Sequence, residues 1–125
     1  MSSPVEPVGV DHIAINVSDV PGAVMFYTEK MGLVQNHTRP DFGFPGAWLD
    51  TVNGQQVHLI EAEVPKNVGQ HFALVFEDLD AAVAELRARG LRVSDPIPVG
   101  TTGRRQAFTA DPYGNGIELH QRTSV

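Results

Sequence analysis

The alternation of hydrophobic and polar positions predicts a strand followed by a helix near the start of the chain. In the stretch HIAINVSD, residues 12–19, apolar side chains occupy every second position. A period of two is that of a half-buried strand, so His12 heads the opposite face of that strand. Asp19 can then cap a helix, with Pro21 just inside its first turn and Gly32 suited to end it.

The same pattern returns at residue 71, which indicates an internal repeat. HFALVFEDLDAAVAEL aligns with HIAINVSDVPGAVMFY with five identities in sixteen positions. The identical pairs are His12/His71, Ala14/Ala73, Asp19/Asp78, Ala23/Ala82 and Val24/Val83. We therefore expect one domain, residues 1–125, built of two modules at about 8–63 and 70–122 and joined by a short polar segment.

Each module continues with segments that predict three more strands after its helix. In the first module these are LVQNHTR (33–39), AWLDTV (47–52) and QQVHLIEA (55–62); in the second they are LRVSD (91–95), RRQAFTA (104–110) and NGIELHQ (115–121). Turn formers separate them, including Asn53-Gly54 and the Asp-Pro-Tyr-Gly sequence at 111–114. Each module therefore has the predicted order βαβββ, in the α+β class.

A second pair of polar residues lies at equivalent positions in the last strands. His58 and Glu118 alternate with apolar neighbours, and each follows the histidine of its module, His12 or His71, by 46 or 47 residues. A pseudo-twofold arrangement of the modules would bring these four side chains together. Three imidazoles and a carboxylate suit Zn, Fe, Mn, Co or Ni, and coordination would explain a carboxylate on a largely apolar strand.

A competing interpretation needs no metal. Glu118 would form a salt bridge with Arg104 or Arg105, and the histidines would merely stack. A single histidine on a strand is more often an ordinary core or edge residue than a ligand, because neutral imidazole buries well once its nitrogens are satisfied. We apply that interpretation to His37 and His120, which have no counterpart in the repeat.

Composition narrows the classes of function. The formal charge of −6 provides no basic surface for a nucleic-acid backbone, so no nucleic-acid partner is expected. The absence of cysteine excludes thiolate chemistry and sulfur ligands. No run of about 18 apolar residues and no signal-peptide pattern occurs, so we expect a cytoplasmic protein without a membrane partner.

Four stretches carry a resemblance to a known family: VDHIAINVSDVPGAVMFYTEKMGL, GQQVHLIE, HFALVFEDLDAAVAELRARGL and DPYGNGIEL. Together the chain resembles the vicinal oxygen chelate superfamily, which includes glyoxalase I, methylmalonyl-CoA epimerase, fosfomycin-resistance enzymes, extradiol dioxygenases and bleomycin-resistance proteins. The resemblance implies two βαβββ modules that form a cup-shaped, eight-stranded mixed sheet with helices outside, around one divalent metal ion. It places His12, His58, His71 and Glu118 where family members have metal ligands.

The resemblance supports three hypotheses about function. The first is a metal-dependent lyase or isomerase of glyoxalase type, acting on a small substrate with adjacent oxygens through a metal-stabilised enediolate or enolate. Glu118 would be its base and His58 the symmetric partner, although glyoxalase I typically has glutamate at the position of His58. The second is an Fe(II)-dependent dioxygenase that uses His12, His71 and Glu118. The third is a protein that binds a drug or metabolite, as bleomycin-resistance relatives do.

The residues expected to contact a substrate come from a loop and a strand. The segment RPDFGFPGAW, 39–48, concentrates Phe44 and Trp48 among turn formers, and such a loop could cover the cup or pack beneath it or at a subunit contact. Arg39 and Arg105 could hold a carboxylate or phosphate, or could simply be solvated. Exposed sheet edges lead us to expect a homodimer.

Overall fold

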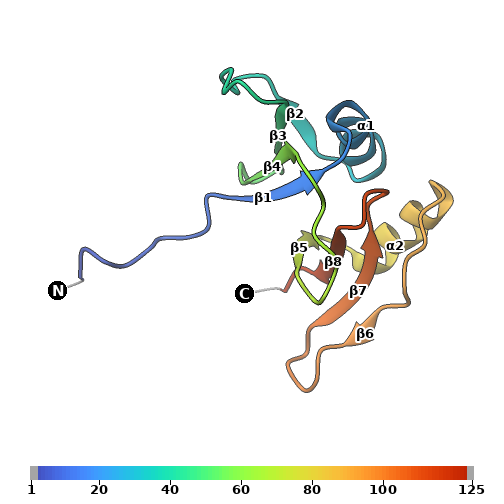
Figure 1. Ribbon diagram of the computed structural model, residues 1–125. Coiled ribbons are helices and arrows are strands. Elements are labelled where there is room, and N and C mark those ends of the chain that lie inside the picture. The colour runs from blue at the N-terminus through green and yellow to red at the C-terminus, as the bar shows by residue number, and fades with distance from the viewer. Residues whose placement is uncertain (1–2, 124–125) are drawn as a thin grey trace. The chain divides into compact units, whose positions relative to one another are not determined.

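A computed structural model describes residues 3–123 of the chain, which fall into two compact units that meet in the sequence at Ala62 and Glu63 (Figure 1). The first unit contains, in order, β1 (His12–Val17), α1 (Val20–Met25), η1 (Phe26–Lys30), β2 (Val34–Asn36), β3 (Gly46–Asp50) and β4 (Gln56–Glu61). The second contains β5 (His71–Phe76), α2 (Leu79–Ala88), β6 (Ile97–Pro98), β7 (Arg105–Ala110) and β8 (Gly116–Gln121). The division falls at the predicted joint between the modules.

The two units have the same sheet topology. Sheet A has the order β1-β4-β3-β2, and sheet B has the order β5-β8-β7-β6. In each sheet the first and last strands of the module pair in parallel, whereas the other pairs are antiparallel. The prediction of an α+β fold with two βαβββ modules is confirmed, and within residues 3–123 the eight strands divide into two four-stranded mixed sheets.

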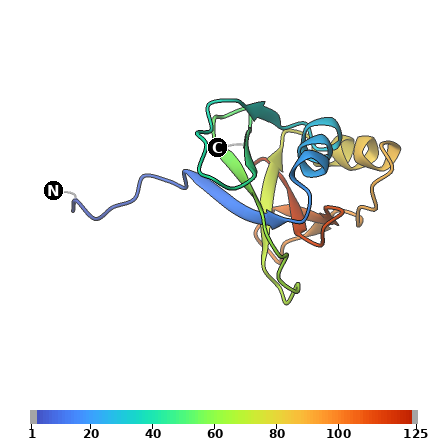
Figure 2. The same ribbon diagram turned by 45° about the horizontal axis from the view of Figure 1, so that its top comes forward.

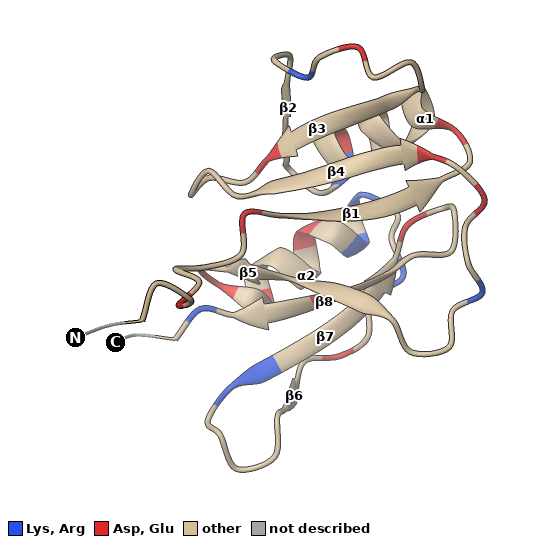
Figure 3. Ribbon diagram, turned by 60° about the vertical axis from the view of Figure 1, so that its left-hand side comes forward, with Lys and Arg blue, Asp and Glu red and all other residues tan. Residues whose placement is uncertain are grey.

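One face of each sheet packs against the helix of its own unit. Leu59 and Leu49 are buried beneath the first helix, and Ile117 and Leu119 beneath α2. Because side chains alternate between faces, the intervening residues of each strand lie on the other side, which we call the open face of that sheet. Figure 3 shows the strands as mainly uncharged, with charged residues gathered in helices, connections and strand ends.

The first helix changes its hydrogen bonding part-way along. After Met25 the helix continues as the π-helix η1, in which the Met31 N–H donates to the Phe26 carbonyl oxygen at 3.2 Å. The helix ends at Lys30, and Gly32, the residue predicted to end it, follows with a positive φ of 80° that glycine adopts readily. Figure 2 shows this helix following β1, which is itself preceded by an extended N-terminal segment.

The predicted strand at 91–95 is wrong. This segment runs along β7, but side chains replace part of the backbone ladder: the Phe108 N–H donates to Ser94 Oγ at 2.8 Å, and Thr109 Oγ1 donates to the Arg92 carbonyl oxygen at 2.8 Å. The short strand β6 lies instead between the predicted strands at 91–95 and 104–110. The predicted strand at 33–39 also shortens to β2, since Asn36 Oδ1 accepts from the Thr38 N–H in a tight turn.

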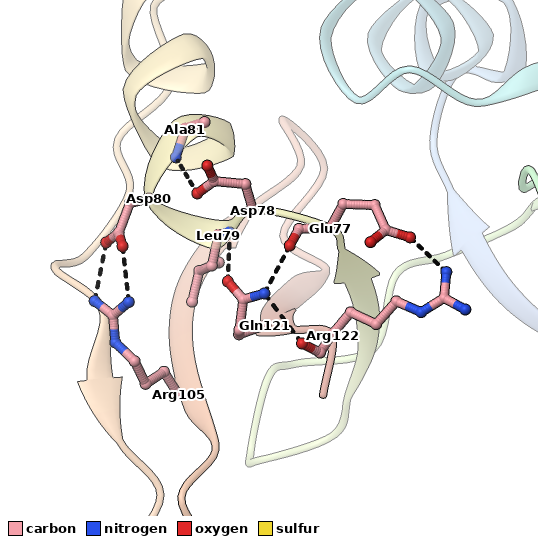
Figure 4. A network of polar contacts seen from close by, with 8 residues as sticks. All are labelled: Glu77, Asp78, Leu79, Asp80, Ala81, Arg105, Gln121 and Arg122. Atoms are coloured by element: carbon pink, nitrogen blue, oxygen red, sulfur yellow. Dashed lines mark hydrogen bonds and ion pairs between the residues drawn. The ribbon is translucent and has the colours of Figure 1, made fainter. Parts of the chain in front are cut away.

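The start of α2 is fastened to the sheet of its own unit by several polar contacts (Figure 4). Asp78 caps the helix by accepting from the Ala81 N–H at 3.0 Å, and the Leu79 N–H donates to Gln121 Oε1 at 2.8 Å. In the first unit Glu61 Oε1 has the place of Gln121 and accepts from the Val20 N–H at 3.3 Å. The last strand of each module therefore fixes where its helix begins. Among residues 3–123, no helix has the length and apolar character needed to cross a membrane.

Candidate functional site

The predicted ligands lie on the open faces of the two sheets. His12 and His58 belong to sheet A, on neighbouring strands β1 and β4. His71 and Glu118 belong to sheet B, on the corresponding strands β5 and β8. Each unit therefore brings together one repeat-related pair. Among the residues that the structure describes, no group of three His, Cys, Asp or Glu side chains is placed to hold a metal ion.

His12 has one ring nitrogen occupied and the other available. Its Nδ1 lies 2.7 Å from Asp11 Oδ2. A carboxylate oxygen in this contact accepts the hydrogen bond, so Nδ1 carries the hydrogen and the lone pair of the neutral ring is on Nε2. A carboxylate that holds Nδ1–H while Nε2 is left for an ion is the usual arrangement of a metal-ligating histidine.

His71 repeats this arrangement with a different acceptor. Its Nδ1 donates to the carbonyl oxygen of Gly69 at 2.8 Å, and its Nε2 lies 3.1 Å from Glu118 Oε1. The pKa of His71 is raised, first by the hydrogen bond to Gly69 and then by Glu118, because both acceptors favour the protonated ring. The Nε2 of His71 and a carboxylate oxygen thus face each other, as two ligands of one ion would.

Glu118 is paired with histidines rather than with arginine. Its second oxygen, Oε2, is hydrogen-bonded to Nε2 of His120, which is buried. His120 Nδ1 is a buried side-chain nitrogen with no hydrogen-bond partner among the described residues. Sequence reasoning treated His120 as an ordinary core residue and so missed this contact. The two-residue spacing from Glu118, which places both side chains on one face of β8, was the signal that could have found it.

His58 lies at the centre of a different network. Its Nε2 is 2.8 Å from Gln56 Oε1, and Gln56 Nε2 donates to Asp50 Oδ1 at 2.9 Å. The His58 ring is stacked between His12, at 3.8 Å between centroids, and Trp48, at 4.6 Å. Burial lowers the pKa of His58, the neighbouring His12 and Arg39 lower it further, and Asp11 opposes them.

Arg39 is held inside the loop that it begins. Its guanidinium lies 5.1 Å from the ring centroids of both Phe42 and Phe44, and it donates to the Phe44 carbonyl oxygen at 3.1 Å. The two phenylalanines are 52% and 45% exposed, so they do not pack beneath the loop. Gly46 leaves the necessary room, because a Cβ there would lie 2.7 Å from Arg39 Nη2.

Arg105 lies on the opposite face of sheet B from Glu118. Phe108 pairs with Glu118, and Arg105, three residues earlier in β7, therefore points to the other face. Arg105 forms two hydrogen bonds with Asp80 of α2, at 2.8 and 2.9 Å (Figure 4). The guanidinium lowers the pKa of Asp80, and Asp80 in turn raises that of Arg105. Arg105 therefore fastens α2 to β7 and is not brought together with the predicted ligands.

Comparison with known proteins identifies the family. Residues 9–119 match the family described as the Glyoxalase/Bleomycin resistance protein/Dioxygenase superfamily. The chain belongs to this superfamily. The match covers both modules and includes His12, His58, His71 and Glu118.

Similar proteins include curated relatives and solved structures. The chain is 31% identical to "Lactoylglutathione lyase GLX1" of Arabidopsis thaliana over 89% of its own length but only 43% of that protein's length. It is 30% identical to "Probable lactoylglutathione lyase" of Vibrio cholerae, over 88% of each chain. Among solved structures, the "putative glyoxalase family protein from Bacillus anthracis" has a TM-score of 0.82 at 22% identity, covering 98% of this chain and 100% of that one. TnmS3, an antibiotic binding protein from Streptomyces sp. CB03234, has a TM-score of 0.80 at 26% identity with the same coverage.

Proposed function

We propose that this protein is a metal-dependent lyase or isomerase of glyoxalase type, acting on a small molecule with adjacent oxygens. The observation that carries the proposal is the matching role of Nδ1 in the two repeat-related histidines. His12 and His71 each give Nδ1–H to an oxygen, and Nε2 of His71 is hydrogen-bonded to Oε1 of Glu118. The lactoylglutathione lyase relatives suggest the substrate class.

The donor set fits a divalent ion of the Zn, Ni, Co, Mn or Fe group. We propose His12, His71 and Glu118 as metal ligands, two neutral imidazoles and one carboxylate. A divalent ion bound there would supply a Lewis acid that polarises a carbonyl group of the substrate. Three protein ligands would leave positions for the adjacent oxygens of that substrate.

Glu118 is also the proposed base. His120 contacts Oε2 and His71 contacts Oε1, and we propose that this carboxylate accepts a proton from the substrate carbon and returns it to the adjacent carbon. Moving a proton between neighbouring carbons isomerises the substrate, so its atomic composition does not change. The relatives and the family membership support this chemistry.

The test begins with metal analysis of protein purified without added metal. We expect about one ion per site in the wild type and loss of that ion in His12→Ala and in Glu118→Ala. His37→Ala is the matched control, because His37 is exposed and has no counterpart in the repeat. Wild-type protein without metal, or variants that keep it, would overturn the proposal.

Activity forms the second part of the test. The hemithioacetal of methylglyoxal and glutathione is incubated in D₂O, and hydrogen exchange at the substrate carbon is followed by NMR. Exchange should disappear in Glu118→Gln and after removal of metal. Oxygen consumption with catechols, in place of such exchange, would favour the dioxygenase hypothesis instead.

A second candidate function is binding of a small aromatic molecule without chemistry. Its support is the likeness to the antibiotic binding protein TnmS3 together with the exposed rings of Phe42 and Phe44. Trp48 is the only tryptophan, so quenching of its fluorescence would report a ligand near the loop. Binding that survives a metal chelator, in a protein without hydrogen-exchange activity, would favour this candidate.

A further inference from the structure

We infer that His58 is not a metal ligand but a positioning residue: Asn36, Asp50 and Gln56 hold it as the Nε2–H tautomer, stacked against His12. The assignment of the tautomer rests on hydrogen-bond geometry within the first unit. Its consequence, that His58 stays outside the ligand set, also rests on the proposed function.

The network starts at Asp50, at the end of β3. Its carboxylate receives Asn36 Nδ2 at 3.1 and 3.2 Å and Gln56 Nε2 at 2.9 Å. A carboxylate oxygen accepts hydrogen bonds, so both amides must turn their NH₂ groups toward Asp50. Turning the Gln56 amide over would place its oxygen against the carboxylate, which is repulsive. Asp50 thereby fixes the orientation of the Gln56 side chain.

The orientation of Gln56 decides the state of His58. With its NH₂ group on Asp50, Gln56 presents Oε1 to His58 Nε2 at 2.8 Å. An amide oxygen only accepts, so Nε2 carries the hydrogen and the lone pair of a neutral ring is on Nδ1. This tautomer is the opposite of that in His12, whose Nδ1 atom is the donor.

Stacking holds the ring in this position. The planes of His58 and His12 are 14° apart, and those of His58 and Trp48 are 11° apart. Turning the His58 ring to release Nε2 would break a hydrogen bond and disturb contacts on both of its faces. His58 thus supports one face of His12, and the orientation of a ligand ring depends on such neighbours.

NMR of the metal-free protein tests the tautomers directly. Nitrogen-15 chemical shifts distinguish protonated from unprotonated ring nitrogens, and we expect His58 to carry hydrogen on Nε2 while His12 carries it on Nδ1. Gln56→Leu removes the acceptor and should abolish the preference in His58. Gln55→Leu is the matched control, because Gln55 points to the Val10 carbonyl oxygen and has no contact with His58. Wild-type His58 with hydrogen on Nδ1 would overturn the inference.

Titration with Co²⁺, followed by absorption, tests the ligand set. His58→Phe keeps a flat ring in the stack but has no nitrogen, so its Co²⁺ affinity should fall by less than about tenfold, the lower end of the cost expected for a group that supports a ligand. His12→Phe should lose Co²⁺ binding altogether. Loss of Co²⁺ binding in His58→Phe would refute the inference and leave the proposed function standing. If the wild type binds no Co²⁺ or other divalent ion, the proposed function fails and the tautomer measurement alone decides the inference.

Discussion

Single side chains in this protein take their roles from partners two residues away or on the next strand. Glu118 is bonded through Oε2 to His120 on its own strand and lies beside His71 on the neighbouring one. In the first module His58 is bonded to Gln56, which is also two residues away but on the N-terminal side. Side chains two residues apart in a strand lie on the same face, so both members of each pair lie on the open face. Strands β8 and β4 therefore each carry a candidate site residue and the group that orients it.

Replacing His120 tests this arrangement at the residue scale. His120→Ala removes the partner of Glu118 Oε2, and we expect Co²⁺ affinity to fall by roughly 10–100-fold, the usual cost of losing such a partner. His120→Gln keeps a donor in the same direction and should restore most of the affinity. Isothermal titration provides the measurement, and equal affinities in wild type and His120→Ala would contradict the role given to His120.

At the scale of elements, the two helices begin alike in sequence but differently in structure. Asp19 and Asp78 are identical in the repeat, and both stand at the N-cap with an extended backbone. Only Asp78 accepts a backbone hydrogen bond through its side chain; Asp19 makes no such cap bond. Helix α2 therefore begins with a capped first turn, whereas α1 has Pro21 in its first turn and no side-chain cap.

Removing the two caps should have unequal effects. Asp78→Ala should lower the free energy of unfolding by about 1 kcal/mol, the typical value of an N-cap hydrogen bond. Asp19→Ala should cost clearly less, because no side-chain bond is lost. Urea unfolding of both variants measures the difference, and a larger effect at Asp19 than at Asp78 would show that the cap bond is not what distinguishes them.

At the scale of the whole molecule, the repeat gives two units with the same topology and unequal chemistry. Each has its own buried layer and its own helix, yet the open face of the first unit has His58 where the second has Glu118. Metal binding of the proposed kind would stabilise the folded chain by mass action, since the unfolded chain has no formed site.

Thermal unfolding should therefore depend on metal. At a free metal concentration of about 100 times Kd, the stabilisation is about 2.7 kcal/mol, and a chelator should remove it. Glu118→Gln is the control, because it keeps the shape of the side chain but not its charge. Melting curves with and without chelator measure the effect; the same shift in wild type and Glu118→Gln would contradict a ligand role for Glu118.

Several features were determined by the sequence alone, because they depend on local periodicity. Residues close together in the chain determine the repeat, the two βαβββ modules and the helix starts at Asp19 and Asp78. They also determine the open-face positions of His12, His58, His71 and Glu118. Strand 91–95 was predicted wrongly because its pattern is apolar enough for a strand. Ser94 and Thr109 nevertheless replace part of the backbone ladder with side-chain bonds.

Only the tertiary structure decided which donor meets which acceptor. The tautomer of His58 depends on Asp50, on a neighbouring strand, and the bond between Arg105 and Asp80 depends on how α2 lies on sheet B. Hydrogen bonds of this kind depend on strand register and helix docking, which set atoms distant in sequence within about 3 Å of each other. The sequence thus determined which residues face the open side of each sheet, whereas packing determined what each of them can do there.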